Sequence, residues 1–82
     1  MHTIKINIEQ TPQGYEFCNG NIAVAQINEI KPDRYRNFSR FALYVASKPY
    51  SSVDSLAMAV EIISDKLEAL FGSLGLNVEF NK

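Results

Sequence analysis

The side chains best suited to binding in this sequence lie between residues 31 and 44. The segment KPDRYRNFSRF, residues 31–41, holds four of the eight Lys and Arg residues of the chain, with aromatic residues between them. Arginine and aromatic residues are enriched at protein-binding hot spots. They also suit nucleic acid, because guanidinium groups contact phosphates and rings stack on bases. The predicted binding residues are Lys31, Arg34, Tyr35, Arg36, Phe38, Arg40 and Tyr44.

The distribution of charge favours a protein partner for this segment. Residues 31–50 carry five Lys and Arg against one Asp, for a net charge of +4, whereas residues 1–30 carry −2 and residues 51–82 carry −3. A nucleic-acid binder that ignores base sequence is usually basic as a whole, because phosphate neutralisation dominates its affinity. We therefore expect a partner protein with an acidic patch, with electrostatics setting the on-rate and the orientation. Nucleic acid is the alternative partner, and an ordinary solvated loop is the third interpretation.

This chain has too few histidine and cysteine residues to build a common catalytic arrangement or a zinc site. His2 is the only histidine and Cys18 the only cysteine, so a nucleophile activated by histidine would depend on a residue at the terminus. A zinc site needs several such ligands. The carboxylates Glu61, Asp65 and Glu68 follow helical spacing opposite an apolar face, which indicates a solvated acidic surface. We expect no enzymatic activity, no metal and no cofactor.

The first half of the chain alternates apolar and polar residues with the period of half-buried strands. Strands are predicted over residues 3–10, 15–18, 21–30 and 38–46. Pro12 and Gly14 predict the first turn, and Asn19-Gly20 predicts a two-residue hairpin turn. The alternation changes phase within the third strand, and a bulge near Ala25-Gln26 would restore it.

Apolar residues at steps of three and four predict one long helix after residue 51. Ser51 and Asp54 match the spacing of a capping box, and Gly72 and Gly75 offer two ends. Residues 77–80, NVEF, predict a last short strand at a sheet edge. The apolar seam consists of Leu56, Val60, Ile63, Leu67, Leu70 and Leu74.

Together these elements predict a single α+β domain over residues 1–82. It has two layers: a four-stranded antiparallel sheet (β-β-β-β-α, with an optional short fifth strand) and one long C-terminal helix packed on one face. A single helix covers one face, and an antiparallel sheet can leave its second face in water. Phe38, Arg40 and Tyr44 alternate with core-facing Phe41, Leu43 and Val45, so we expect the first three on the open face.

The sequence therefore predicts a non-enzymatic protein-binding module, an adaptor or an inhibitor, which docks through residues 31–44 and the open sheet face. Small domains without catalytic groups are common among phage and mobile-element inhibitors such as anti-CRISPR proteins, and only size and character support that comparison. Met58 and Ile62 lie four residues apart on a flank of the helix and are the candidates for a homodimer contact.

The expected location is the cytoplasm. A single cysteine excludes an internal disulfide, and small domains without disulfides suit reducing compartments. The alternating N-terminus, MHTIKINIEQ, does not resemble a secretory signal. No apolar run approaches the roughly 18 residues that a membrane span requires, so no membrane partner is expected.

Overall fold

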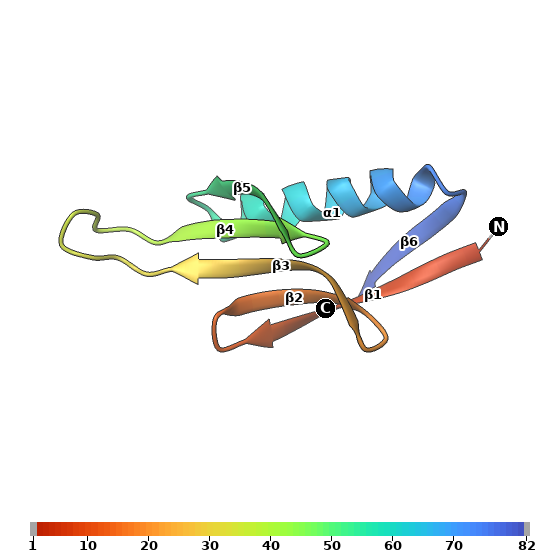
Figure 1. Cartoon of the computed structure of the whole chain (residues 1–82), viewed down its shortest axis with the longest axis horizontal. Coiled ribbons are helices and arrows are strands. Elements are labelled where there is room, and N and C mark those ends of the chain that lie inside the picture. Colours follow the sequence, from red (N-terminus) through yellow and green to blue (C-terminus); the bar gives the residue numbers. More distant parts are fainter. Residues whose placement is uncertain (1, 82) are drawn as a thin grey trace.

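The computed structural model describes residues 2–81 and contains one helix and a mixed sheet of six strands (Figure 1). The strand order is β5-β4-β3-β2-β1-β6, in which β1 and β6 are parallel and all other neighbours are antiparallel. The elements are β1 (His2–Thr11), β2 (Gly14–Asn19), β3 (Ile22–Ile30), β4 (Arg40–Val45), β5 (Lys48–Val53), α1 (Leu56–Gly72) and β6 (Leu76–Asn81).

The α+β class and the single C-terminal helix agree with the sequence pattern, and the four predicted antiparallel strands are present as β1 to β4. The sheet differs from the prediction in having six strands and in being mixed, because β6 is parallel to β1. The strand that the pattern does not predict is β5. A two-residue turn, Ala46-Ser47, reverses the chain after β4, with φ angles of +53° and +65°. Asn and Gly dominate such turns, and neither occurs here, so the sequence lacks the usual hairpin signal.

The start of the helix also differs from the predicted capping box. Ser51 pairs with Leu43 inside the sheet, so it does not cap the helix. The N-cap is Ser55, whose side-chain oxygen accepts a hydrogen bond from the backbone N–H of Met58 at 3.3 Å. The capping function is therefore four residues later than the pattern predicts, because β5 occupies the intervening chain.

The predicted last strand is confirmed as β6, at an edge of the sheet. The helix connects β5 at one edge to β6 at the other, which makes β6 parallel to β1. The predicted bulge is also present: Phe17 pairs with Ala25 and Cys18 with Ala23, so Val24 is the extra residue of β3. The predicted Asn19-Gly20 turn moves by one residue, since Asn19 still pairs with Ile22.

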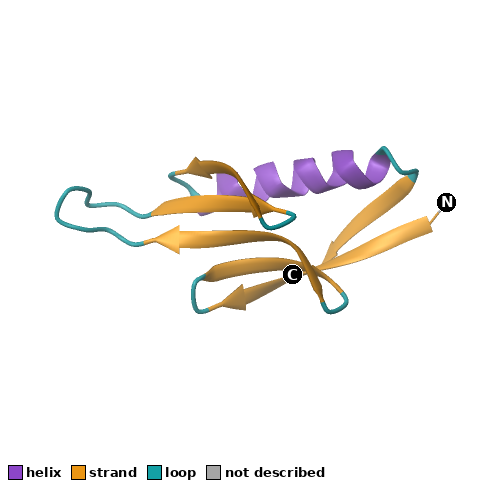
Figure 2. Ribbon diagram, in the orientation of Figure 1, coloured by secondary structure: helices purple, strands orange, loops and turns teal. Residues whose placement is uncertain are grey.

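The helix runs along one face of the sheet (Figure 2), and the buried side chains of the core come from the helix and from that face. The helix contacts β3, β4 and β5 as well as β6, so the sheet curls around it from both edges. Phe17 and Phe80 meet edge to face, with ring centroids 6.3 Å apart. The fully buried cluster consists of Ile6, Phe17, Ala25, Ile27, Leu43, Ala59, Ile63 and Leu67.

The predicted burial of the apolar seam is confirmed in the middle of the helix and is wrong at its C-terminal end. Ile63 and Leu67 are buried, whereas Leu70 and Leu74 are 41% and 71% exposed. The helix ends at Gly72, so Leu74 lies in the following turn and no longer obeys helical spacing. Leu70, Leu74 and the exposed Ile22 line an apolar cavity of about 420 Å³ between the helix and the start of β3.

Candidate functional site

Most of the predicted binding residues lie in the connection between β3 and β4, residues 31–39, which we call the arm. The arm projects beyond the rest of the molecule at one end of its longest axis (Figure 1). That axis measures 50 Å, whereas the other two extents are 21 and 20 Å. The arm therefore reaches into solvent with little of the body beside it.

The tip of the arm is a turn organised by Asp33. Its backbone N–H donates to the carbonyl of Arg36 at 2.9 Å, and the N–H of Arg36 donates back to the carbonyl of Asp33 at 3.3 Å. The Asp33 carboxylate also accepts hydrogen bonds from the N–H groups of Tyr35, at 2.8 Å, and Arg36, at 3.0 Å. Aspartate is favoured in turns because its side chain bonds backbone groups two residues onward. Arg34 and Tyr35 are the two residues enclosed by this turn.

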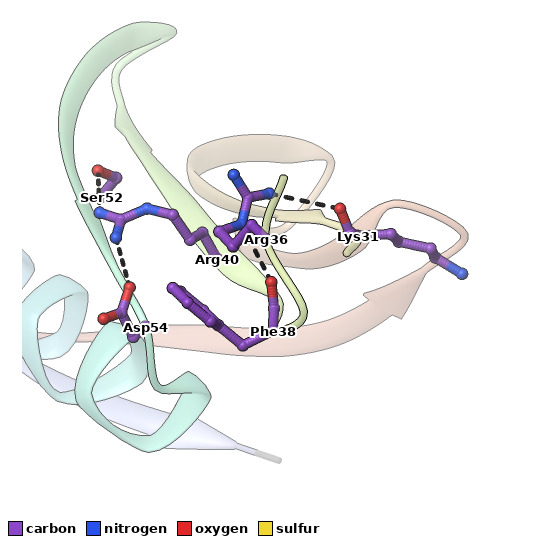
Figure 3. A network of polar contacts seen from close by, with 6 residues as sticks. All are labelled: Lys31, Arg36, Phe38, Arg40, Ser52 and Asp54. Carbon is purple, nitrogen blue, oxygen red and sulfur yellow. Dashed lines mark hydrogen bonds and ion pairs between the residues drawn. The ribbon is translucent and has the colours of Figure 1, made fainter. Parts of the chain in front are cut away.

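The side chain of Arg36 connects the two limbs of the arm (Figure 3). Its Nε donates to the carbonyl of Phe38 at 3.0 Å, and its Nη2 donates to the carbonyl of Lys31 at 3.4 Å. The guanidinium also lies 5.8 Å from the centroid of the Phe38 ring. Arg36 therefore shapes the arm from within while its positive charge remains without a carboxylate partner among residues 2–81.

The outermost side chains of the arm form a cationic and aromatic surface. Tyr35 is 83% exposed, and the Arg34 guanidinium lies 5.0 Å from the centroid of its ring. Phe38, at the base of the arm, is 46% exposed. A large exposed aromatic side chain on a hydrogen-bonded turn is typical of a binding surface, because such anchors carry most of the energy at interfaces.

Two of the seven predicted binding residues lie outside the arm. Arg40, at the start of β4, forms an ion pair with Asp54 and donates a hydrogen bond to the Ser52 side chain at 3.0 Å (Figure 3). Its charge is therefore largely neutralised within the protein. Tyr44 follows four residues later, roughly 13 Å along the same strand, where it is half-buried. The structure thus brings five residues together and separates the other two from them.

The open face of the sheet is acidic where Tyr44 lies. Tyr44 pairs with Gln26, which pairs with Glu16, which in turn pairs with Glu9, so these side chains form one row across four strands. The Gln26 amide donates to the Glu16 carboxylate at 3.4 Å. Two carboxylates opposite each other on neighbouring strands make this face unsuited to an acidic partner. The arm alone has the charge that the sequence pattern predicts for the site.

The remaining candidates for chemistry lie apart from the arm. Cys18 is buried, and this burial raises the pKa of its thiol; a hydrogen bond to Glu9 and the charges of Glu9 and Glu16 act in the same direction. A buried thiol with a raised pKa is a poor nucleophile. Met58 is 53% exposed on the helix, whereas Ile62 packs against the core. Within residues 2–81, no three His, Cys, Asp or Glu side chains are grouped to hold a metal ion.

Sequence reasoning does not identify Asp33 as part of the site, although the turn depends on it. The signal is present: an aspartate after Pro32, two residues before Tyr35, is the usual position for such a side-chain contact.

Among the described residues, no helix has both the length and the apolar character needed to cross a membrane.

No protein-family model, curated protein or solved structure matches this chain. Its function is therefore inferred from the geometry and charge of the arm.

Proposed function

We propose that this protein is a non-enzymatic protein-binding module, an adaptor or an inhibitor, whose arm docks on an acidic patch of a partner protein. The observation that carries the proposal is the exposed Tyr35 ring, with the Arg34 guanidinium 5.0 Å from its centroid, on a turn held by Asp33. A turn that is already ordered loses less conformational entropy on binding than a flexible loop would. The arm therefore suits tight, oriented docking.

The charge of the arm supports a compact acidic partner. Lys31, Arg34 and Arg36 against Asp33 give the arm a net charge of +2, so the rest of the chain carries −3 of the total of −1. A long duplex lying along the acidic body would be repelled, whereas an acidic patch on a protein can meet the arm alone. In this proposal Tyr35 fills a pocket in the partner, and Lys31 and Arg34 pair with its carboxylates.

The proposal places the protein in the cytoplasm, since its one cysteine is buried and free. An inhibitor would use the arm to occupy a site that the partner needs for its own ligand. Nucleic acid is the alternative partner for the same cations and rings, and the experiment below separates the two.

An affinity capture from native lysate tests the proposal. The wild-type chain, an Arg34→Glu/Tyr35→Ala variant and a Lys48→Glu variant would each be immobilised, with and without nuclease treatment. Lys48 is exposed on β5, outside the arm, and so provides a charge-reversal control. We expect one partner protein to be captured by the wild type and by Lys48→Glu, and to be lost with the double variant.

Two results would oppose the proposal. Capture of the same protein by the double variant would show that the arm is not the docking surface. Retention of DNA or RNA at 50 mM salt, with a steep loss of affinity by 200 mM salt and no protein partner after nuclease treatment, would establish the nucleic-acid alternative instead.

A further inference from the structure

The two edges of the sheet differ in how they resist pairing with another strand. At the β5 edge, Lys48 is exposed and Pro49 lacks a backbone N–H. Pro49 pairs with Tyr44 and Ser51 with Leu43, so Tyr50 is an extra residue that bulges this strand. Lysine, proline and bulges are the features by which natural sheets block edge-to-edge association.

The β6 edge has none of these features. Its sequence, LNVEFN, contains no lysine and no proline, and its register with β1 runs without a shift from Leu76 to Asn81. No strand lies on its outer side, and within residues 2–81 no turn or loop backbone group hydrogen-bonds to it. Half of its backbone N–H and C=O groups therefore face outward, available to another strand.

We infer that β6 pairs with β6 of a second copy, antiparallel and about a two-fold axis at Val78. In this register Leu76 of one copy lies opposite Phe80 of the other, and Asn77 lies opposite Glu79. Residues 76, 78 and 80 are half-buried on the helix side, while residues 77, 79 and 81 are exposed on the other side. Apolar side chains thus meet apolar ones, and an amide meets a carboxylate.

The length and the pattern of β6 favour this register over its neighbours. An axis on Asn77 would place Glu79 and Phe80 opposite residues 75 and 74, which lie in the turn before the strand. A shift that centres the axis on Glu79 would place two carboxylates opposite each other, which is unfavourable. A pairing offset by one residue would set apolar side chains opposite polar ones across the sheet. With Val78 on the axis, every pair within residues 76–80 is compatible.

We assign a second copy of this chain as the partner of the β6 edge for two reasons. The half-buried Leu76, Val78 and Phe80 would gain cover from the same residues of the other copy, and a domain of this size has limited burial of its own. Pairing of β6 with β5 of another copy would form an open chain, but the protected β5 edge opposes it; a two-fold pair closes at once. The arm lies at the far end of the molecule from the start of β6, so both arms of a dimer stay free (Figure 1).

Analytical ultracentrifugation over a range of protein concentrations, up to the millimolar range, tests this inference. Asn77→Glu would place a carboxylate opposite Glu79 of the other copy at two positions, so we expect a roughly tenfold weaker dimer. Asn77→Lys would pair with Glu79 twice, so we expect a dimer several times tighter. Asn21→Glu, in the exposed turn between β2 and β3, carries the same change in charge away from the edge and should leave association unchanged.

Opposite effects of Glu and Lys at one exposed position distinguish pairing from a loss of structure, because damage to the fold would shift both variants in the same direction. A monomer at every concentration would overturn the inference. So would a dimer in which Asn77→Glu behaves like Asn21→Glu, or one that dissociates with Met58→Glu alone, since contact would then lie on the helix. Circular dichroism of each variant would verify that the fold is intact.

Discussion

The Arg34 guanidinium lies over the ring of Tyr35, 5.0 Å from its centroid, within the turn between Asp33 and Arg36. The two side chains are adjacent in sequence and share the tip of the arm, where Tyr35 is 83% exposed. An exposed ring contributes little to folding but offers large contact area to a partner. Binding and stability should therefore respond very differently to changes at this position.

Replacing Tyr35 with alanine should leave folding intact and abolish most binding. We expect the free energy of unfolding to change by less than about 0.5 kcal/mol, as is usual for exposed positions. Affinity for the captured partner should fall by about tenfold or more, because Tyr35 is the proposed anchor. Urea unfolding and calorimetric titration measure the two quantities, and Tyr35→Phe serves as the control. Unchanged affinity would remove Tyr35 from the site.

Asp33 should control the rigidity of the arm. In Asp33→Ala the N–H groups of Tyr35 and Arg36 lose their side-chain acceptor, so their amide hydrogen exchange should accelerate while exchange in β1 stays the same. Asp33→Asn retains an acceptor oxygen and should behave more like the wild type. Equal exchange at Tyr35 in all three proteins would show that the carboxylate does not hold the turn.

Gly14 should tolerate no side chain. A Cβ built there would lie 2.0 Å from the carbonyl oxygen of Ile27, and the backbone has a φ of +155°. We expect Gly14→Ala to lower the free energy of unfolding by about 3 kcal/mol or more, because the clash is with backbone. Gly72 is the last residue of the helix, and a Cβ there would meet nothing within 4 Å, so Gly72→Ala should raise the free energy of unfolding by roughly 0.5 kcal/mol. Denaturant titration compares them, and similar effects would contradict the clash.

The turn between β4 and β5 should be open to stabilisation. Ala46 and Ser47 both have positive φ angles, a conformation that costs roughly 1–2 kcal/mol for each residue with a Cβ. Ala46→Asn with Ser47→Gly should raise the free energy of unfolding by about 1–2 kcal/mol, since Asn-Gly suits such turns. Ser47→Val should lower it. Thermal and urea unfolding measure both, and a neutral Asn-Gly variant would argue against strain at this turn.

Cys18 should make stability fall at alkaline pH. Burial raises the pKa of its thiol in the folded protein, so the unfolded chain loses the proton first as the pH rises above the ordinary thiol value, roughly 8.5. Stability is therefore complete below that pH and declines until the pH passes the folded pKa. Urea unfolding between pH 7 and pH 10 should show a steeper decline for the wild type than for Cys18→Ala. Parallel curves would contradict the shift.

Much of the architecture is readable from local pattern. Alternation over residues 3–10 predicts β1, and the three-four spacing around Ile63 and Leu67 predicts the buried side of the helix. The phase change in the third strand likewise predicts a bulge, which the structure places at Val24. These features depend on neighbours within a few residues, so periodicity is enough to reveal them. Local composition, rather than periodicity, identifies the arm as the basic and aromatic segment of the chain.

The tertiary structure decided which of those cations remain available. Arg40 and Arg34 belong to the same basic and aromatic segment, so the sequence does not distinguish them. In the structure Arg40 pairs with Asp54, which lies fourteen positions later and is brought beside it by the β4–β5 hairpin. It also decided the place of β6 beside β1, since a strand that arrives through a helix has no local signal for its partner. Periodicity records which side of an element is buried, but the partner across space follows only from how the whole chain folds back.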